Sequence, residues 1–577
     1  MRKRIIVTIG LVLCLMLLGG CGVLGASETF EYEDNGDGTA TITRHIPGRS
    51  GTSVSIPAEI NGLVVTAIGD RAFHNNERLT VITIPETITT LPWTLGFISS
   101  TVRTTGESEL FNNLTRIEVS EQNPVFSSID GVLYNNDATV LIRVPPRLEL
   151  AGFAIPDTVT TIARGAFWGC KYITGNLVIP ENVTAIERSA FERASGFTGD
   201  LFIPDSVTYI GYSAFHSATG FDGNLTLPSG ITTVADYAFY GLTEITGDLI
   251  IPYGVTTIGE YAFSNSAFTG RLILPESLVA IERGAFASSR FVGSLVIPRS
   301  VTTVGERAFS GVAGFTGDLV IPGNVVEIGA WAFSGGLDGS NSEFTGLTIS
   351  YGVSTIGESA FSNVNFVGHL VIPDSVTEIG SRAFDWNRGF TGLTLSANIT
   401  RIEERAFAIG SEATGSLVIP YGVTTIGRDA FVGTGFSDVV IPESVTEISG
   451  YAFAWCNYLT SVTIPESVTV IAGGAFYGNS RLSRVVFLGD APESYNDFWS
   501  YGRHPGDGAF IYMFSRTASM LPQDSEATYL FERSTKLEIF YDPERVGWDE
   551  AKQSAFGYDM ISFRPLSDFH GSMGSSN

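Results

Sequence analysis

One short pattern is repeated along more than half of the chain, and it constrains the fold more than any other feature. Between residues 155 and 490 an Ala-Phe pair recurs fourteen times in register, with a mean period of about 24 residues. Each of these phenylalanines follows a proline by 11 residues, with Ser350 and Ser396 in the proline place of two units. A period of this length is typical of solenoids, in which each repeat is one structural unit that is stabilised by its neighbours.

A single unit reads as strand, corner and strand. In the unit from Leu249 to Phe263, Leu249 and Ile251 alternate with Ile250 as in a short strand, and Pro252 ends that strand because proline has no N–H to donate. The β-branched segment Val255–Ile258 predicts a second short strand. A glycine turn and a single 3₁₀-like turn are then expected to direct Ala-Phe inward.

Stacked units would bury the apolar positions that one unit leaves exposed. We therefore predict a β-rich repeat solenoid with two short parallel strand ladders and little helix. Where an extra residue follows a Thr-Gly, as in Phe197–Leu201, we expect a β-bulge beside the glycine. A recurring threonine slot is interpreted as a surface ladder of strand-forming residues. The phenylalanines expected in the central core ladder include Phe191, Phe215, Phe239, Phe263, Phe286 and Phe309.

The repeat resembles a known family. Leu459–Pro465 and Leu79–Pro85 have the L-x-x-L-x-L form of a leucine-rich repeat, and Val468, Ile471 and the Ala-Phe at Phe476 complete a unit that is similar to the BspA-like, or Treponema-type, leucine-rich repeat of bacterial surface proteins. Two further strings also match, one at residues 35–42 and one at residues 123–134. The stretch 86–122 lacks an Ala-Phe and is expected to be an irregular insertion.

The first residues resemble an export signal. Arg-Lys-Arg at residues 2–4 precedes an apolar run over residues 5–18, which is too short to span a bilayer comfortably. The run ends in Leu18-Gly19-Gly20-Cys21, which resembles the lipobox of bacterial lipoproteins. This resemblance implies that Cys21 becomes a lipid-modified first residue; the alternative is a plain secretory signal.

These patterns divide the chain into five segments. Residues 34–39 could also suggest a calcium loop, but the Glu expected at the closing ligand position is missing, and they are interpreted as a hairpin turn rich in Asn and Gly. The resemblance to the terminal segment of the same family implies that the last segment is a cap. The predicted segments are a lipoprotein signal peptide over 1–20, an anchor linker over 21–27, an N-terminal cap with irregular early repeats over 28–154, the regular solenoid over 155–490 and a C-terminal cap over 491–577.

Composition and motifs favour a protein without a catalytic centre. The formal net charge of -26 disfavours a nucleic-acid partner. No lysine is preceded by glycine, so the chain has no Walker-type phosphate loop, and it contains neither H-E-x-x-H nor G-x-S-x-G. We expect no enzyme activity, no cofactor and no metal site. The polar candidates for catalysis in the C-terminal segment are Asp497, His504, Asp507 and Asp524.

Aromatic residues recur just before the Ala-Phe pairs and are weak candidates for a ligand surface. Packing between turns is the competing interpretation and is favoured, although tyrosine beside charged residues is also typical of contact surfaces. Cys170 and Cys456 lie twelve repeats apart, too far for a disulfide, and are expected to be buried small hydrophobic residues. The candidate aromatics are Tyr212, Tyr237, Tyr261, Trp331 and Tyr451.

The family resemblance implies a non-catalytic adhesion or protein-interaction protein, displayed as a leucine-rich-repeat rod at the bacterial cell surface or outer membrane. Its implied partners are host matrix or epithelial proteins, or other bacterial surfaces, and it would contact the membrane only through its lipid anchor. Two alternatives stay open. The C-terminal segment could have an enzymatic or glycan-binding role, or the repeats could form an envelope spacer without a ligand.

The lipobox interpretation makes a direct prediction for Cys21→Ala. Without the thiol no lipid can be attached, so the variant should incorporate no labelled fatty acid and should leave the membrane fraction. The parent should incorporate the label and stay in the membrane fraction. Cys170→Ala is the matched control, because it removes a cysteine that is not part of the signal. Equal labelling of parent and Cys21→Ala would contradict lipidation.

Overall fold

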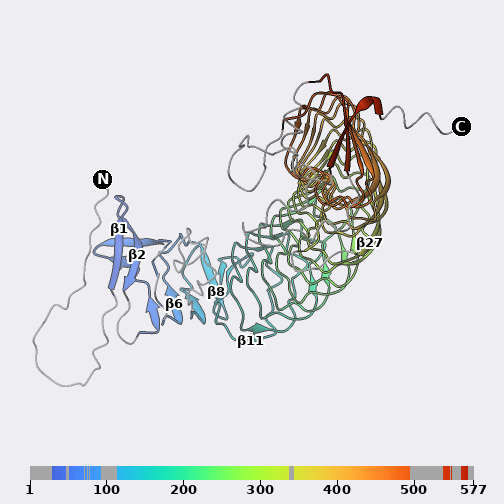
Figure 1. Cartoon of the computed structure of the whole chain (residues 1–577). Coiled ribbons are helices and arrows are strands. Elements are labelled where there is room, and N and C mark those ends of the chain that lie inside the picture. The colour runs from blue at the N-terminus through green and yellow to red at the C-terminus, as the bar shows by residue number, and fades with distance from the viewer. Residues whose placement is uncertain are drawn as a thin grey trace, which may run out of the picture. The chain divides into compact units, whose positions relative to one another are not determined.

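The computed structural model describes residues 29–46, 51–92, 113–336, 343–493, 537–548 and 561–568, apart from residues 71, 74, 75, 77, 546 and 547. The chain forms two compact units, the first built from residues 1–255 and 262–268 and the second from residues 256–261 and 269–577. Each unit consists of stacked coils joined by short strands (Figure 1), and the described residues form a β-solenoid with almost no helix. The predicted fold class is confirmed.

The first unit begins with longer and more irregular strands. β1 and β2 form an antiparallel hairpin around the Asn-Gly turn, as predicted. On its other side, β2 pairs in parallel with β5. Within the stretch expected to be irregular, β7 pairs in parallel with β6, so part of it continues the ladder. These strands are β1 (Thr29–Asp34), β2 (Thr39–Ile46), β3 (Ser53–Ser55), β4 (Glu59–Ile60), β5 (Leu63–Ile68), β6 (Val81–Ile84), β7 (Arg116–Val119), β8 (Phe126–Ile129), β9 (Val132–Asn135) and β10 (Val140–Arg143).

The regular coils of the first unit carry very short strands. β10, β12, β14 and β16 pair in parallel as one ladder, while β11 with β13 and β15 with β17 form pieces of the other. The strands are β11 (Leu150–Ala151), β12 (Thr161–Ile162), β13 (Ile173–Thr174), β14 (Ala185–Ile186), β15 (Leu201–Phe202), β16 (Tyr209–Ile210), β17 (Leu225–Thr226), β18 (Thr233–Val234) and β19 (Leu249–Ile250).

The second unit contains two ladders of the same kinds, each made of runs of parallel strands. One ladder follows the Val-Thr-Thr-Ile segments and consists of β20 (Thr257–Ile258), β22 (Ala280–Ile281), β24 (Thr303–Val304), β26 (Glu327–Ile328), β28 (Thr355–Ile356), β30 (Glu378–Ile379), β32 (Arg401–Ile402), β34 (Thr425–Ile426), β36 (Glu447–Ile448) and β38 (Val470–Ile471). The other precedes the prolines and consists of β21 (Leu272–Ile273), β23 (Val292–Gly293), β25 (Gly314–Ile321), β27 (Glu343–Ile349), β29 (Val367–Val371), β31 (Gly389–Thr394), β33 (Thr414–Val418), β35 (Gly435–Val440), β37 (Ser461–Ile464) and β39 (Arg484–Phe487).

Two strands from the C-terminal segment extend this second ladder. β40 (Leu537–Tyr541) pairs in parallel with β39, and β41 (Ile561–Pro565) pairs in parallel with β40. Trp548 is buried against Phe487, with 4.9 Å between ring centroids, and its Nε1 donates to the carbonyl of Gly489 at 3.3 Å. The C-terminal segment therefore adds strands to the last coils of the repeat.

The predicted bulges are present beside glycines. The register between neighbouring long strands shifts after Gly317, Gly368 and Gly415. All three glycines have positive φ, between 77° and 93°. Glycine tolerates this backbone conformation without the steric penalty of a Cβ, so the bulge can accommodate the extra residue without disturbing the coil.

The turn that carries Ala-Phe differs from the expected 3₁₀ turn. In the coil of Phe191, the amides of residues 190, 192 and 194 bond to carbonyls three residues earlier, whereas the amides of Ser189, Phe191 and Arg193 bond to the next coil at 2.7–2.9 Å. Every amide from 189 to 194 thus has a partner, and alternate amides tie one coil to the next. The predicted single turn is in fact a ladder of overlapping turns.

Left-handed residues make this alternation possible. The residue immediately before Ala-Phe has φ between 51° and 74° in all fourteen coils, and only Gly165, Gly284 and Gly474 are glycines there. Ser213, Tyr237 and Trp331 are examples of side chains held in a conformation that costs about 1–2 kcal/mol per residue. A 3₁₀ turn cannot continue through a left-handed residue, which explains the difference from the expectation.

The phenylalanines of the Ala-Phe pairs stack face to face along each unit. From Phe167 to Phe263 the ring centroids are 4.6–5.4 Å apart, and from Phe286 to Phe476 they are 5.3–5.8 Å apart, with interplanar angles of no more than 13° in both series. A second ring series, represented by Phe197 and Phe221, packs edge-on against the first. All of these rings are buried.

The threonine slot has a structural role. The hydroxyls of Thr184, Thr208, Thr424 and Thr446 each donate to the backbone carbonyl at the same slot of the preceding coil, at 3.2–3.4 Å. These bonds run along the edge of the strand ladder on the exposed side. They support the interpretation of this slot as a surface ladder.

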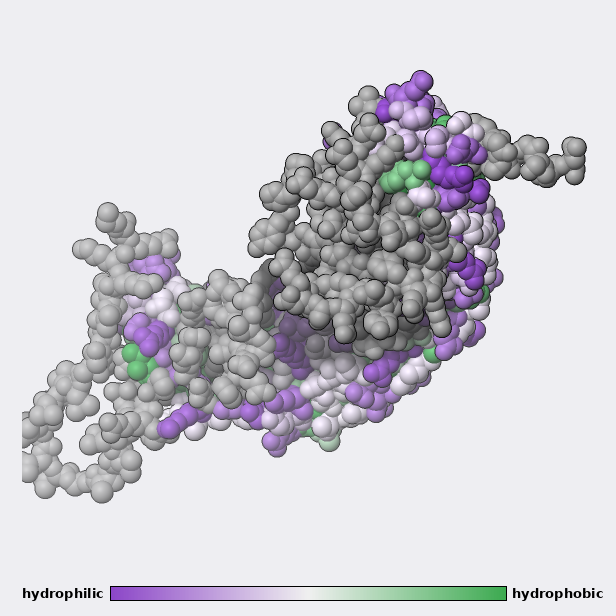
Figure 2. Space-filling model, viewed as in Figure 1, coloured by the Kyte–Doolittle hydropathy of each residue, from purple (hydrophilic) through white to green (hydrophobic). Residues whose placement is uncertain are grey.

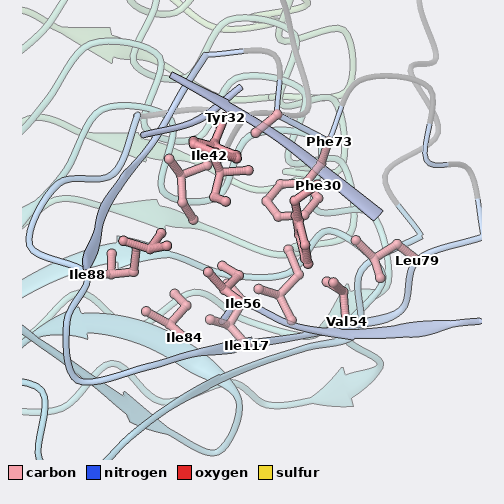
Figure 3. Packing of buried hydrophobic residues seen from close by; sticks show 14 of the residues in the cluster. Phe30, Tyr32, Ile42, Val54, Ile56, Phe73, Leu79, Ile84, Ile88 and Ile117 are labelled. Carbon is pink, nitrogen blue, oxygen red and sulfur yellow. The ribbon is translucent and has the colours of Figure 1, made fainter. Parts of the chain in front are cut away.

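The early coils enclose a separate apolar core (Figure 3). Phe30 from β1, Ile42 from β2 and Ile84 from β6 converge there with Phe73 and Ile117. At the end of β2, the ring of His45 lies between Phe30 and Phe73, with centroid distances of 5.1 and 5.7 Å. Burial lowers the pKa of His45 from its ordinary value near 6.5.

We predict that Phe215→Ala lowers the free energy of unfolding by about 3 to 5 kcal/mol, because it removes a fully buried ring from the stack. Phe202→Ala is the matched control, since the Phe202 side chain is half exposed and should change stability by about 0.5 kcal/mol or less. Denaturant unfolding followed by far-UV circular dichroism measures both. Equal effects of the two substitutions would contradict a buried stack.

The N-terminal core should be sensitive to acid. Because the folded state holds His45 with a lowered pKa, the unfolded chain binds the proton more readily, so stability falls as the pH drops below about 6.5. We predict that His45→Phe loses less stability than the parent between pH 7.5 and pH 5.5, as measured by thermal unfolding. An identical pH dependence in both proteins would show that His45 does not contribute to it.

Candidate interaction surface

An apolar stripe runs along the outer side of the strand ladder that precedes the prolines. The leucine and isoleucine at the ends of each strand point into the core, so the residue between them points outward. In nine coils this residue is a valine, isoleucine or phenylalanine that is 39–68% exposed. The residues, defined here as the aliphatic stripe, are Val178, Phe202 and Ile250 in the first unit and Ile273, Val296, Val320, Val371, Val418 and Val440 in the second.

Members of the stripe lie directly opposite either another member or a threonine of the next coil where the strands pair. Val418 pairs with Val440, and Val320 and Val371 pair with threonines at the same position of the next coil. Side chains at paired positions of adjacent strands lie in contact range. The exposed side chains therefore form an apolar strip that is interrupted by threonines.

In the second unit a groove of about 560 Å³ lies over this strip. Val296 and Val320 line it together with the charged side chains of Glu276, Arg299 and Asp318. A lining that combines exposed apolar side chains with charged ones is typical of surfaces that bind another molecule. Figure 2 shows the general setting, in which apolar residues lie among hydrophilic ones on the face in view.

Three tyrosines stand at the corner that follows the strand. Tyr253, Tyr351 and Tyr421 are 77–81% exposed, and each precedes a glycine with φ between 105° and 118°. The glycine allows the corner to turn sharply, so the tyrosine projects from it. Sequence reasoning did not identify these tyrosines or the aliphatic stripe. The available signals were the repeated Tyr-Gly after the strand and apolar residues at the outward strand position.

The five aromatics proposed from the sequence lie on the turns and pack between coils. Tyr237, Tyr261, Trp331 and Tyr451 occupy the left-handed position before Ala-Phe, and Tyr212 lies one residue earlier than this slot. All are partly exposed.

Four of these rings lie beside an arginine of an adjacent coil, and the fifth lies beside other aromatic rings. The guanidinium carbons lie 4.5–5.9 Å from the ring centroids, and Tyr237 lies 5.6 Å from Tyr212 and 5.8 Å from Tyr240. Such contacts stabilise the turn face. A ligand role for the five residues stays a prediction. The arginine partners are Arg188 for Tyr212, Arg283 for Tyr261, Arg307 for Trp331 and Arg428 for Tyr451.

The two described cysteines are free and buried, as expected. Burial raises the pKa of the Cys170 thiol to about 12 and that of Cys456 to about 11. A thiol with so high a pKa is a poor nucleophile at neutral pH. Both residues therefore act as small apolar side chains that fill the core.

Several residues singled out in the sequence lie outside the described residues. They include Cys21 with the signal segment, and Asp497, His504, Asp507 and Asp524 in the C-terminal segment. Within the described part of the chain, no group of three or more His, Cys, Asp or Glu side chains is arranged to hold a metal ion. No helix in that part has the length and apolar character needed to cross a membrane.

Comparison with protein families identifies the repeat. The BspA-type leucine-rich repeat region, in six copies, matches residues 50–128, 147–246, 222–337, 340–460 and 410–499, which together cover well over half of the chain. The chain belongs to the BspA-type leucine-rich repeat family. The resemblance noted from Leu459–Pro465 and Leu79–Pro85 is thus confirmed. No curated protein matches the chain significantly.

Solved structures with similar coils are bacterial leucine-rich repeat proteins. A leucine-rich cell-surface protein of Faecalibacterium prausnitzii is 23% identical, with a TM-score of 0.33 over 80% of this chain and 93% of that one. A leucine-rich repeat protein of Bacteroides ovatus is 17% identical, with a TM-score of 0.32 over 95% and 100% of the two chains. The pneumococcal vaccine antigen PcpA is 15% identical, with a TM-score of 0.23 over 61% and 92%.

Proposed function

We propose that the protein is a non-catalytic surface protein that binds macromolecular partners along the outer side of its strand ladder. The observation that carries the proposal is the aliphatic stripe, with the exposed corner tyrosines and the groove that charged side chains line beside Val296 and Val320. Apolar residues at repeated outward positions lower the solubility of a protein. Threonine would suit an exposed strand without a binding role, and it occupies this position at Thr226 and Thr394.

Repetition favours an extended partner. Successive coils present the same outward position at steps of about 4.8 Å, so weak contacts with an extended ligand can add up through multivalency without a deep pocket. BspA-type repeats are typical of surface and interaction proteins. We infer that the partners are host matrix or epithelial proteins, or other bacterial surfaces, and that the function is adhesion or protein interaction.

Electrostatics limits which partner segments can bind. The chain carries a net charge of -26, so a matrix protein is expected to approach through its basic segments. Salt screens such attraction over about 8 Å at physiological ionic strength. Retention that weakens with added salt would indicate this mode, whereas retention that is insensitive to salt would indicate contact through the apolar strip.

Export and anchoring complete the proposal. The basic and apolar start of the chain and the Leu-Gly-Gly-Cys string support display outside the cytoplasm through lipid on Cys21. Of the alternatives, an enzymatic role for residues 491–577 has no support from the part that the structure describes, where β40 and β41 extend the repeat ladder. A ligand-free spacer would leave the aliphatic stripe without an explanation.

The stripe can be tested by two isosteric substitutions. Val418→Thr together with Val440→Thr keeps the strand shape, because threonine already occupies this position in other coils, but it replaces exposed methyl groups by hydroxyls. We predict about tenfold weaker retention on immobilised host matrix proteins, which corresponds to about 1.4 kcal/mol of binding free energy. Surface plasmon resonance at two salt concentrations measures the effect.

Val279→Thr together with Val326→Thr is the matched control. Both valines are 42–55% exposed and lie in the threonine slot of the other ladder, so this pair makes the same chemical change away from the stripe. The control should bind like the parent. The proposal fails if the two pairs of substitutions have equal effects, or if no matrix protein, mucin or bacterial surface retains the parent at micromolar concentration.

A further inference from the structure

A second kind of site lies on the turn side of the second unit. A cavity of about 390 Å³ opens beside the coils of Phe384, Phe407 and Phe431. Its walls carry an aromatic ring, two arginines, two carboxylates and a hydroxyl, which is a different chemistry from that of the aliphatic stripe. The groups are Trp386, Arg388, Arg405, Asp385, Glu412 and Ser411.

Trp386 contributes the aromatic ring of the cavity wall. It lies two positions after Phe384 with φ of 63°, in a slot that glycine occupies at Gly169, Gly241 and Gly433. The slot is left-handed in other coils too, and it holds side chains such as Arg193, Asn265 and Trp455, so the backbone conformation is a regular property of the coil. The indole is 50% exposed, so an aromatic face is held at the surface at a cost that glycine would avoid.

One side of the indole is already covered. The guanidinium carbon of Arg388 lies 4.7 Å from the ring centroid of Trp386. The backbone of Arg388 is close to Gly410, where an added Cβ would lie 3.3 Å from the Arg388 Cα. The arginine therefore covers one part of the ring, and a ligand can reach the part of the indole that stays exposed.

The other walls are polar and partly rigid. Arg405 donates to both carboxylate oxygens of Asp385, with Nε at 2.9 Å and one terminal nitrogen at 3.1 Å, and the Asp385 side chain is almost fully buried. Such a bidentate pair holds its geometry well. Glu412 and Ser411 are exposed on the opposing segment, and within the described residues Glu412 forms no ion pair.

The charges in the cavity cancel. Arg388 and Arg405 contribute two positive charges, and Asp385 and Glu412 contribute two negative ones. A phosphate, a sulfate or a cationic group would meet both attraction and repulsion there. The cavity is therefore suited to a ligand that is uncharged yet rich in hydrogen-bonding groups, and its volume lies within the range of small-molecule sites.

We propose that this cavity binds a neutral sugar ring, as part of a glycan. A pyranose has an apolar face of C–H groups, which can stack on the exposed part of the Trp386 ring, and a rim of hydroxyls. The hydroxyls can accept from Arg388 and donate to Glu412, while Ser411 can do either. This site goes beyond the proposed function, since it is a single cavity and not a surface repeated along the coils.

A peptide is the competing ligand, and the cavity favours it less. Peptide recognition relies on apolar pockets for side-chain anchors or on a strand edge. The walls here combine four charged side chains with one aromatic ring, one hydroxyl and the small or apolar residues Ala408, Gly410, Val432 and Gly433, and they include no strand edge. A peptide ligand is thus kept as an outcome of the test.

The test uses a glycan array and a peptide array probed with the purified protein. The array contains neutral oligosaccharides ending in galactose, mannose or N-acetylglucosamine, together with sialylated and sulfated members. We expect retention of neutral members, and a titration of the best one should change the tryptophan fluorescence. Trp386→Gly should weaken this binding about tenfold or more, and glycine is already accommodated in the same slot of other coils.

Trp455→Gly is the matched control. Trp455 occupies the same left-handed slot with φ of 60° and is 49% exposed, but it lies outside the cavity, so its loss should leave glycan binding unchanged. The proposal is overturned by binding only of charged glycans, by binding only of peptides, by no binding, or by equal losses in the two variants. The stripe variants at Val418 and Val440 should retain glycan binding, so failure here is distinguishable from failure of the proposed function.

Discussion

The hydrogen bonds that join one coil to the next are the constraint on which the rest of the structure depends. A single coil has two short strands and one turn, and it encloses no core of its own. In the turn of Phe191, three amides bond within the coil and three bond to the following coil. This division requires left-handed residues at fixed positions, and the same positions place each Ala-Phe pair inside. The backbone pattern and the phenylalanine stack are thus two aspects of one arrangement.

This arrangement separates the residues that stabilise the coils from those that are available for binding. Apolar residues at the strand ends, the Ala-Phe pairs and the second ring series are all buried. Outward strand positions and corner residues contribute little to the core, so they can vary without loss of the fold. The valines of the aliphatic stripe and the tyrosines at Tyr253, Tyr351 and Tyr421 occupy such positions. Their apolar and aromatic side chains are exposed and do not belong to the buried core.

Sequence reasoning predicted the features that depend on burial. The 24-residue period predicts the solenoid. The proline that ends each strand and the glycine beside each bulge predict the ladders and the bulges, because the backbone conformations of proline and glycine differ sterically from those of other residues. The family of the repeat could also be predicted, from strings such as Leu459–Pro465. The ladder role of β7 was missed, because Arg116–Val119 has no Ala-Phe after it.

The features that depend on neighbouring coils were not predictable in the same way. Nothing in Tyr237 or Trp331 indicates a left-handed backbone, since the conformation is imposed by the bonds to the adjacent coil. The cavity at Trp386 combines side chains from three coils, and sequence distance gives no indication that Asp385 bonds to Arg405. For the candidate site, the sequence indicated aromatic residues on the turns but not the stripe on the strands.

Native-state hydrogen exchange of individual amides tests the central claim most directly. If coils are held together by the alternate amides, then Ser189, Phe191, Phe215 and Arg193 should exchange only through large-scale unfolding, as slowly as the buried strand amides of Ile186 and Ile210. These turn amides would otherwise belong to an exposed loop and exchange rapidly. Fast exchange of the alternate turn amides in coils whose strands remain protected would contradict the account.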